Sequence, residues 1–577
     1  MPRDSIRAHA GVSVVLASGA RFASTCGEKL APFSSDIVEP LRTIGAESSC
    51  RRAECSLDAP IRQCHPRYFV AHALHLAQRM IVTWSRLIPL TAFVVLLASA
   101  GALAQSTDSA PSDEAPAEEP RPFQLPTTTS LQLPTTTAPS EGRDCPGCPP
   151  RRLGSSFIWV TVVNGMYEMA NLIRGQDTAK ITPETWWVNM KRGWEWDLDD
   201  FAVNQIGHPY QGNNYFTTGR SNGLNFWESA GLTAFGSGTW EYFGETNQAS
   251  LNDFINTTLG GIALGEMFHR TAWLVRNTQA TGRSRMWNEI GAMALDPMSG
   301  LMRFMSGDAS RVVDKPSDMV PSQLSTLASF GGLWRGSNTE AIEPNTYGFF
   351  ETDLLYGDVL SGSSHTPYDA FAVRLSFGGG SAFSEARVRG RLYSRPAGRT
   401  LFTIAQAYQF NNNPAYRFGA QAFEGLFIGE KRLTSRLSMV AVGGGGATVL
   451  GAVDSIPLTG IVPEEPPPDA GQGVSTGPRY YDYGPGGNLT ATFVLRRDNK
   501  LILNFGWELH HLHVLDGVRA NHVLQRSRLD FMWPLKGAFG VGGSTEFFSR
   551  RTFYAGDAGE TLYHFPQYRV YLTWTAS

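Results

Sequence analysis

At residues 501–510 the chain reads Leu501-Ile502-Leu503-Asn504-Phe505-Gly506-Trp507-Glu508-Leu509-His510. The odd positions are apolar throughout, whereas Asn504, Glu508 and His510 occupy even positions. Successive side chains of an extended strand point to opposite faces, so a period of two places all the odd side chains on one face. This stretch therefore predicts a β-strand with one apolar face and one polar face.

The same period recurs along the C-terminal half of the chain. Besides 501–509, alternating segments lie near 349–356, 371–377, 385–392, 402–410, 416–428, 437–442, 488–496, 522–533, 541–548 and 568–574. Segments of about ten residues with one apolar and one polar face are typical of a transmembrane antiparallel β-barrel. Bacterial single-chain barrels favour an even number of strands, so we expect a further strand near Leu327 to Trp334 and about twelve in all.

Three features favour a membrane barrel over a soluble antiparallel sheet, which would also alternate. A predicted export signal precedes the strands. Arg387, Arg389 and Arg391 share one face of a strand, which a polar lumen accommodates. Aromatic residues gather near strand ends, as at Tyr408 and Phe410, and predict girdles at the two membrane interfaces. A secreted soluble β-protein remains the alternative.

The last strand ends near an aromatic residue, Trp574, which Thr575-Ala576-Ser577 follows. This resembles the C-terminal signal for barrel assembly, although the usual signal places the aromatic residue last. We therefore predict a barrel over 311–577 in the bacterial outer membrane. Its expected partners are outer-membrane lipid and, during biogenesis, the barrel-assembly machinery.

Residues 80–104 predict a secretory signal peptide. Arg86 precedes the apolar run 87–97, and Ala102-Leu103-Ala104 is a small-x-small cleavage site. The apolar run is too short for a membrane-spanning helix. Residues 1–79 are interpreted as a spurious or disordered extension; a real cytoplasmic extension is the alternative.

Composition excludes several classes of partner. The net charge of the chain is only -3, so no basic field indicates nucleic acid. No nucleotide loop or calcium loop is present, and we expect no cofactor. Residues 105–152 form a Pro-, Thr- and Ser-rich linker that we expect to be disordered. Within it, Cys145 and Cys148 predict a local disulfide formed on export.

Residues 153–310 predict a helical domain rich in polar and aromatic residues. Ser250-Leu251-Asn252-Asp253 has the spacing of a capping box, with Asp in place of Glu, before a helix over Phe254 to Arg276. On that helix Glu266 and Arg270 lie four residues apart, in the order that favours an ion pair. Because the domain precedes the first strand, we expect it to plug or cap the periplasmic mouth of the barrel.

Polar, aromatic and glycine residues are densest between Trp194 and Arg270. The motifs are Asp199-x-Phe201-x-x-Asn204-Gln205-x-x-His208-Pro209-Tyr210-x-Gly212-x-x-Tyr215-Phe216, Arg220-x-x-Gly223, Trp240-Glu241, Ser250-x-x-Asp253 and Gly260-Gly261-x-x-x-Gly265-Glu266-x-x-x-Arg270. This pattern resembles a bacterial family known only as domain of unknown function 3943. The resemblance implies an outer-membrane β-barrel with an added polar and aromatic region, and it implies no activity.

We interpret most of this block as one ligand-binding or structural network. Buried charged groups must be paired and hydrogen-bonded, and the block offers both signs of charge. The expected members are Asp199, Asn204, His208, Tyr210, Tyr215, Arg220, Trp240, Glu241, Asp253, Glu266 and Arg270.

His208 is the candidate catalytic residue, with Glu241 and Glu266 as candidate acids. As a general base it would need an orienting acid and a nucleophile, for which Ser229 and Ser237 are candidates. In the alternative interpretation, His208 braces a turn that Pro209 and Gly212 enforce. No two histidines of the block have helical ligand spacing, so no metal site is predicted.

Two functions therefore remain open. The first is an outer-membrane β-barrel of unknown activity, with a helical module in the periplasm or the lumen, that passes or binds a small or lipidic ligand. The second is an outer-membrane enzyme that acts on lipid or envelope glycan through His208 and a carboxylate.

Overall fold

The computed structural model describes residues 148–339, 342–362, 366–454, 481–498, 500–556 and 559–576. The predicted extension at 1–79, the signal peptide at 80–104 and nearly all of the linker at 105–152 lie outside the described residues. Cys148 is disulfide-bonded, whereas Cys145 lies outside the described residues.

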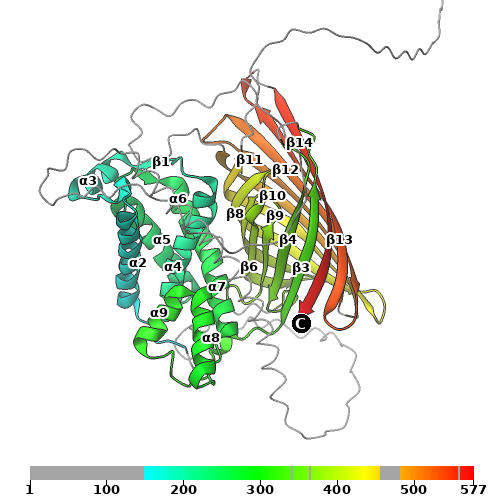
Figure 1. Cartoon of the computed structure of the whole chain (residues 1–577), viewed down its shortest axis with the longest axis horizontal. Coiled ribbons are helices and arrows are strands. Elements are labelled where there is room, and N and C mark those ends of the chain that lie inside the picture. Colours follow the sequence, from blue (N-terminus) through cyan, green and yellow to red (C-terminus); the bar gives the residue numbers. More distant parts are fainter. Residues whose placement is uncertain are drawn as a thin grey trace, which may run out of the picture. The chain divides into compact units, whose positions relative to one another are not determined.

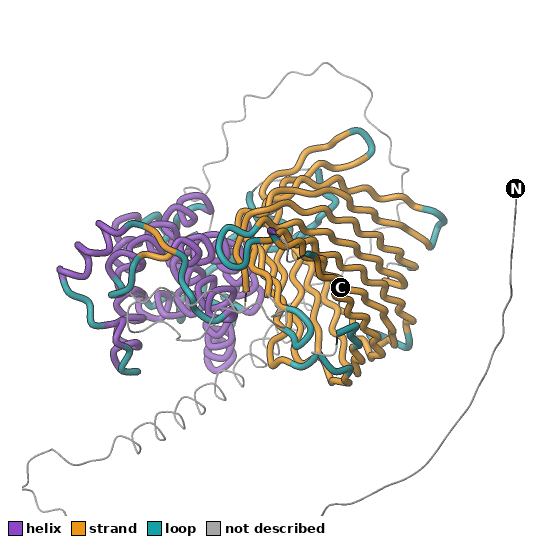
Figure 2. The backbone as a smooth tube through the Cα atoms, turned by 90° about the horizontal axis from the view of Figure 1, so that it is seen from above, coloured by secondary structure: helices purple, strands orange, loops and turns teal. Residues whose placement is uncertain are grey.

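Twelve antiparallel strands form a closed barrel (Figures 1 and 2). They are β3 (Leu324–Arg335), β4 (Asn345–Tyr356), β5 (Phe371–Gly378), β6 (Ser381–Ala397), β7 (Thr400–Asn412), β8 (Arg417–Arg432), β9 (Leu437–Asp454), β10 (Tyr481–Arg497), β11 (Lys500–His513), β12 (Ala520–Pro534), β13 (Phe539–Tyr554) and β14 (Glu560–Ala576). Each strand pairs with the next, and β14 pairs with β3 to close the ring. The predicted barrel is confirmed, and β3 is the strand expected near Leu327 to Trp334.

A helical module of residues 153–306 precedes the barrel. Its helices are α2 (Leu153–Ile173), α3 (Pro183–Arg192), α4 (His208–Ser221), α5 (Phe226–Phe243), α6 (Leu251–Ile255), α7 (Gly261–Val275), α8 (Gly282–Leu295) and α9 (Pro297–Ser306). The short strands β1 (Trp194–Glu195) and β2 (Ala249–Ser250) pair in parallel. Among the described residues, no helix combines the length and the apolar content that crossing a membrane requires.

Side-chain caps determine where several helices begin. Thr182, Asn225 and Asp296 accept hydrogen bonds from the first turns of α3, α5 and α9. Ser250 caps α6 as predicted, but its own backbone N–H donates to Glu241 rather than to Asp253. The expected helix over Phe254 to Arg276 is present, with a π-helical turn at Asn256–Gly260 between α6 and α7.

Ion pairs across the barrel identify its inner face. Glu385 on β6 pairs with Arg526 on β12, and these strands stand six places apart in the ring of twelve. Side chains alternate along each strand, so the neighbours of Glu385 and Arg526 face outward. Two residues illustrate the two faces. Ala386 on β6 faces outward and packs against the helical module, whereas Leu524 on β12 faces inward and packs against other lumen residues.

The helical module packs on the outer face of the barrel wall. One apolar core joins module residues Phe201, Phe216, Phe226, Ile262, Leu264 and Met267 to barrel residues Leu354, Phe371, Val373, Ala386, Val388, Tyr408, Phe410, Leu450, Tyr481 and Tyr483. These barrel residues alternate with the lumen residues of the same strands, and therefore point outward. We predicted that the module plugs or caps the periplasmic mouth, but it covers the outer wall instead. The order of elements does not determine which face of a strand a preceding helix covers.

Several aromatic residues near strand ends, where we predicted membrane girdles, face protein instead. Tyr408, Phe410 and Tyr481 are buried against the module. Phe531 and Trp533, in contrast, are exposed on the outer face of β12. An outward aromatic residue can face either lipid or another part of the protein, and alternation does not distinguish the two.

Within the module, α4 and α7 approach each other at a glycine contact. A Cβ atom on Gly212 would overlap the carbonyl oxygen of Thr257 and the backbone of Gly261. One on Gly265 would overlap the ring of Phe216. These glycines therefore allow the two helix backbones to approach closely. As a result, polar residues of α4 and of the π-helical turn lie in contact.

Candidate functional site

The predicted network divides into two clusters. The first, called here the acid–histidine cluster, contains Asp197, Asp199, His208, Glu241, Glu245 and Asp253. The second, called the arginine cluster, contains Arg220, Glu266 and Arg270. The candidate catalytic set of His208, Glu241 and Glu266 is therefore not assembled as predicted: Glu241 lies with His208, and Glu266 does not.

His208 begins α4 and is buried between α4 and the π-helical turn. Its Nδ1 lies 3.3 Å from the hydroxyl oxygen of Thr257, and its Nε2 lies 3.5 Å from a carboxylate oxygen of Asp253. Pro209 and Gly212 lie inside α4 and enforce no turn. The interpretation of His208 as the brace of a turn is therefore wrong, and the imidazole instead joins a hydroxyl to a carboxylate.

The carboxyl groups around His208 are buried beside one another. Burial and the nearby carboxylates raise the pKa of Asp199 to about 6 and that of Glu245 to about 7. The same causes raise the pKa of Glu241 and Asp253 well above the usual range of carboxylic acids. Burial lowers the pKa of His208, so its imidazole is neutral at neutral pH. The cluster therefore retains protons where exposed carboxyl groups would have lost them.

The ligand atoms of this cluster form two groups of three, each close enough together to bind one cation. Ligand atoms of His208, Glu241 and Asp253 lie within 4.8 Å of one another, and so do those of Asp197, Asp199 and His208. Carboxylate oxygens with one imidazole suit a hard or borderline divalent cation. The sequence did not predict this arrangement because the ligands come from four separate segments.

Hydrogen bonds attach this cluster to the barrel wall. Asn204 donates to Asp197 at 2.8 Å and to the hydroxyl of Tyr481 at 2.7 Å. The hydroxyl of Tyr481 donates to the backbone carbonyl of Asp199. The hydroxyl of Tyr408 donates to the carbonyl of Gln205 at 2.6 Å. The outward tyrosines of the barrel thus hold the segment that supplies Asp197 and Asp199.

The arginine cluster is a buried ion pair network. Glu266 is fully buried, with Arg270 Nε at 2.8 Å and Arg220 Nε at 3.0 Å. Burial by itself would raise the pKa of Glu266, but Arg220 and Arg270 hold it below the usual value. Arg270 also donates to the backbone carbonyls of Asp318 and Pro367. The predicted Glu266–Arg270 pair is confirmed, and it ties α7 to the loop between β4 and β5.

The other predicted residues have structural contacts. Tyr215 donates to Asn164 and accepts from Gln211, while Tyr210 packs edge-on against Phe268. Trp240 donates to Glu245 at 2.9 Å. The candidate nucleophiles lie elsewhere: Ser237 donates to the carbonyl of Phe254, and Ser229 contacts the backbone of α4 at Gly219.

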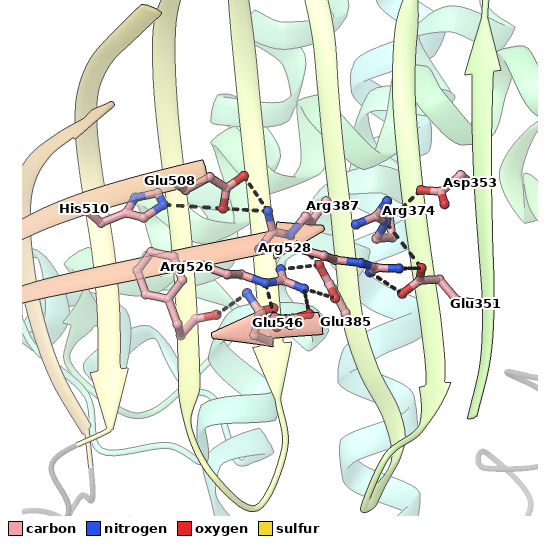
Figure 3. Close-up of polar contacts among 12 residues, drawn as sticks. Glu351, Asp353, Arg374, Glu385, Arg387, Glu508, His510, Arg526, Arg528 and Glu546 are labelled. Carbon is pink, nitrogen blue, oxygen red and sulfur yellow. Dashed lines mark hydrogen bonds and ion pairs between the residues drawn. The ribbon is translucent and has the colours of Figure 1, made fainter. Parts of the chain in front are cut away.

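The sequence did not predict the largest polar network, which fills the barrel lumen (Figure 3). Arg526 bridges Glu385 and Glu546, at 2.8 Å to each. Arg569 bridges Glu351 and Glu546 at 3.0 and 3.2 Å. Further pairs join Arg528 to Glu351, Arg387 to Glu508 and Arg374 to Asp353. The alternation of Arg526 with Arg528 and of Glu385 with Arg387 was the available signal, but alternation alone does not show which partners meet across the lumen.

Little free space remains within this network. A cavity of about 20 Å³ lies among Arg335, Glu385, Arg526 and Arg569. A second, of about 10 Å³, lies beside Arg387, Glu508 and His510. Each has room for about one water molecule.

Fold and site together define a closed twelve-stranded antiparallel β-barrel that carries a helical module on its outer wall. Residues 193–298 match the family described as "Domain of unknown function (DUF3943)", which is the family that the sequence motifs resemble. The matched residues hold both the acid–histidine cluster and Glu266 with Arg270.

Solved structures of two porins and of an outer membrane protein are among those that are similar to this chain. The NanC porin is 9% identical, with 43% of this chain and 98% of that chain covered and a TM-score of 0.22. The KdgM porin is 8% identical, with coverage of 43% and 98% and a TM-score of 0.20. OmpT of Vibrio cholerae without loop L8 is 7% identical, with coverage of 44% and 99% and a TM-score of 0.18. No curated protein matches the chain.

Proposed function

We propose that the protein is an integral β-barrel of the bacterial outer membrane whose lumen is held closed by ion pairs. The single observation that carries this proposal is the division between the two faces of the strands. The inner face bears cross-lumen ion pairs such as Glu385–Arg526. The outer face bears large exposed apolar side chains, among them Phe330, Phe427, Phe505, Trp533, Val570 and Leu572.

A barrel in water would not expose this outer surface. Val570 is 71% exposed, and Leu572 and Phe330 beside it on the outer face are also exposed. Contiguous apolar patches of this kind mark a surface that meets lipid or another apolar partner. Strands of 15 and 16 residues, as in β12 and β13, exceed the roughly 9 to 11 residues that a tilted strand needs to cross a bilayer.

Binding of a ligand fits this structure better than passage through the lumen. Passage of a small or lipidic molecule would require the network around Arg526 to break, and each buried charge would then lose its partner. The acid–histidine cluster, outside the lumen, is the place where ligand binding is supported by convergent polar groups. The proposed protein is therefore a closed barrel that holds a binding module against its wall.

Fractionation and a gel shift test the location of the barrel. We expect the mature protein in outer-membrane fractions, with a slower-migrating species appearing in electrophoresis after boiling. Recovery of the folded protein from the periplasm without detergent would contradict the proposal.

The second candidate function is that of an enzyme that acts on lipid or envelope glycan, and one observation favours it. Thr257, His208 and Asp253 form a hydroxyl–imidazole–carboxylate chain, which is the order of groups that activates a nucleophile. In this candidate function, the neutral His208 takes the proton of the Thr257 hydroxyl, and the carboxyl group of Asp253 beside Nε2 orients the imidazole.

A variant without the Thr257 hydroxyl distinguishes the two candidate functions, an enzyme and a binding module. Thr257→Val removes the hydroxyl but keeps the shape of the side chain. If the protein is an enzyme, this variant should abolish the turnover of envelope lipid or glycan that the wild-type protein restores to a deletion strain. Full restoration by a folded Thr257→Val protein would exclude this candidate.

A further inference from the structure

We propose that the helical module contacts the acyl chains of the same membrane through the exposed faces of α2, α5 and α8. The proposal rests on the proposed location of the barrel in a membrane. It goes further, because it assigns a lipid-facing role to helices that the motifs alone would place in water or in the lumen.

The exposed face of α2 is apolar along its whole length. Ile158, Val162, Met166, Met169 and Ile173 are exposed at intervals of three and four residues, and Ile173 is 79% exposed. The one acidic residue of this helix, Glu168, has both carboxylate oxygens buried. With 21 residues the helix is about 31 Å long, close to the roughly 30 Å of a bilayer's hydrocarbon core.

Charged side chains flank α2 at both ends. Arg151 and Arg152 precede the helix, and Arg174 follows it. Arginines at the ends of an apolar face can extend their head groups to the interface while their stems stay in the apolar region. The charges and the apolar face of α2 thus have the order expected of a helix beside lipid.

Two further helices of the module also expose large apolar side chains. On α5, Trp227 and Phe235 are exposed, and on α8 Met286, Trp287, Ile290 and Met293 are exposed. Trp287 is 65% exposed. A large apolar side chain that is exposed singly needs no explanation, but exposed apolar side chains in number on each of three helices do.

The barrel itself shows where lipid begins. Module residues bury Gln406 and Tyr408 on the outer face of β7, and Ile404, the next outward residue of that strand, is exposed. On β8 the outward Gln421 is buried beside Gly260 of the module, whereas the outward Phe423 and Phe427 are exposed. A single strand therefore passes from beneath the module to the apolar outer belt, so the module borders the surface proposed to face lipid.

Two polar residues of α2, Asn164 and Tyr167, do not oppose this inference, because they point into the module. Asn164 binds Thr239 and Tyr215, and Tyr167 accepts a hydrogen bond from Asn214. The mean hydropathy of α2 is lowered by the polar residues on its inner face, which agrees with the finding that no described helix is long and apolar enough to cross a membrane. The lipid contact proposed here requires only one apolar face, and the opposite face rests on protein.

Spin-label accessibility tests the proposal in the full mature protein reconstituted in phosphatidylethanolamine–phosphatidylglycerol vesicles. Single cysteines replace Met169, Ile290 or Trp287 in the module, with Val570→Cys on β14 as the lipid control and Asp314→Cys as the water control. Oxygen concentrates in lipid and a nickel chelate concentrates in water. We expect the module sites to favour oxygen over nickel, as at Val570, with the opposite preference at Asp314.

Three other results are possible, and each contradicts either the lipid contact of the module or the membrane location of the barrel. If Val570 favours oxygen but the module sites favour nickel, the module faces water and this inference fails while the membrane barrel stands. If Val570 also favours nickel, the proposed location of the barrel fails. If neither reagent reaches the module sites, a protein partner or a second copy covers them, and the inference fails in favour of that interface.

Discussion

At the residue scale, the most consequential groups are carboxyls whose pKa values burial has raised. Glu245 is an example, with a pKa of about 7 where an exposed glutamate lies near 4.5. Between these two values the folded state binds a proton that the unfolded state has lost. The stability of the module should therefore be greatest at acidic pH and should decrease as the pH rises from about 4.5 to about 7.

Glu245→Gln tests this pH dependence. The amide keeps an oxygen to accept the hydrogen bond from Trp240, but it does not ionise. At pH 8 we expect the free energy of unfolding of the variant to exceed that of the wild type by about 2 to 3 kcal/mol, with a correspondingly higher unfolding temperature; at pH 4.5 the two should be nearly equal. Helical circular dichroism during heating in detergent measures the difference. Asp177→Asn, in an exposed pair with Lys180, is the matched control and should change little at either pH.

Arg526 provides a second prediction at this scale. Arg526→Ala leaves Glu385 and Glu546 buried without this partner, and we expect a loss of about 3 to 5 kcal/mol of barrel stability. The temperature at which the gel shift occurs should fall accordingly. Arg551→Ala breaks an ion pair with Glu560 that is half exposed, and it should cost at most about 1 kcal/mol. Equal losses in the two variants would show that the lumen pairs are not specially buried.

At the element scale, the contact between α4 and α7 is the feature most open to a decisive substitution. A methyl group at Gly212 would overlap the backbone of the π-helical turn, so Gly212→Ala should separate the helices and displace His208 from Thr257. We expect the helical signal to melt earlier while the heat-modifiable barrel remains. Gly231→Ala on the exposed face of α5 has free space, and it should be neutral or stabilise the helix by up to about 1 kcal/mol. A module that tolerates Gly212→Ala as well as Gly231→Ala would contradict this packing.

The elements also show how far sequence reasoning extends. Alternation predicted the strands because the period of two follows from local backbone geometry. It could not predict that Tyr408 faces helices while Phe531 is exposed, since both positions have the same local pattern. For the site, Glu266–Arg270 was predictable at a separation of four residues. The pairs His208–Asp253 and Glu266–Arg220 depend on how distant segments of the chain pack, and a single sequence does not contain that information.

At the scale of the whole molecule, a closed barrel carries a helical module on its outer wall. The ion pairs cross the lumen, and the outward tyrosines that hold the segment of Asp197 and Asp199 lie on β7 and β10 of the same barrel. Polar groups therefore lie both inside the barrel and between the barrel and the module, while the exposed outer surface is apolar.

Single-channel recording in a planar bilayer tests the closed lumen most directly. The wild-type protein and an Arg526→Ala/Arg528→Ala double variant are inserted under the same conditions, so that the variant controls for insertion. We predict no stable open-channel current from the wild type and stepwise conductance from the double variant, whose lumen has lost the central side chains. Stable conductance of the wild-type protein, as in an open pore, would contradict the account.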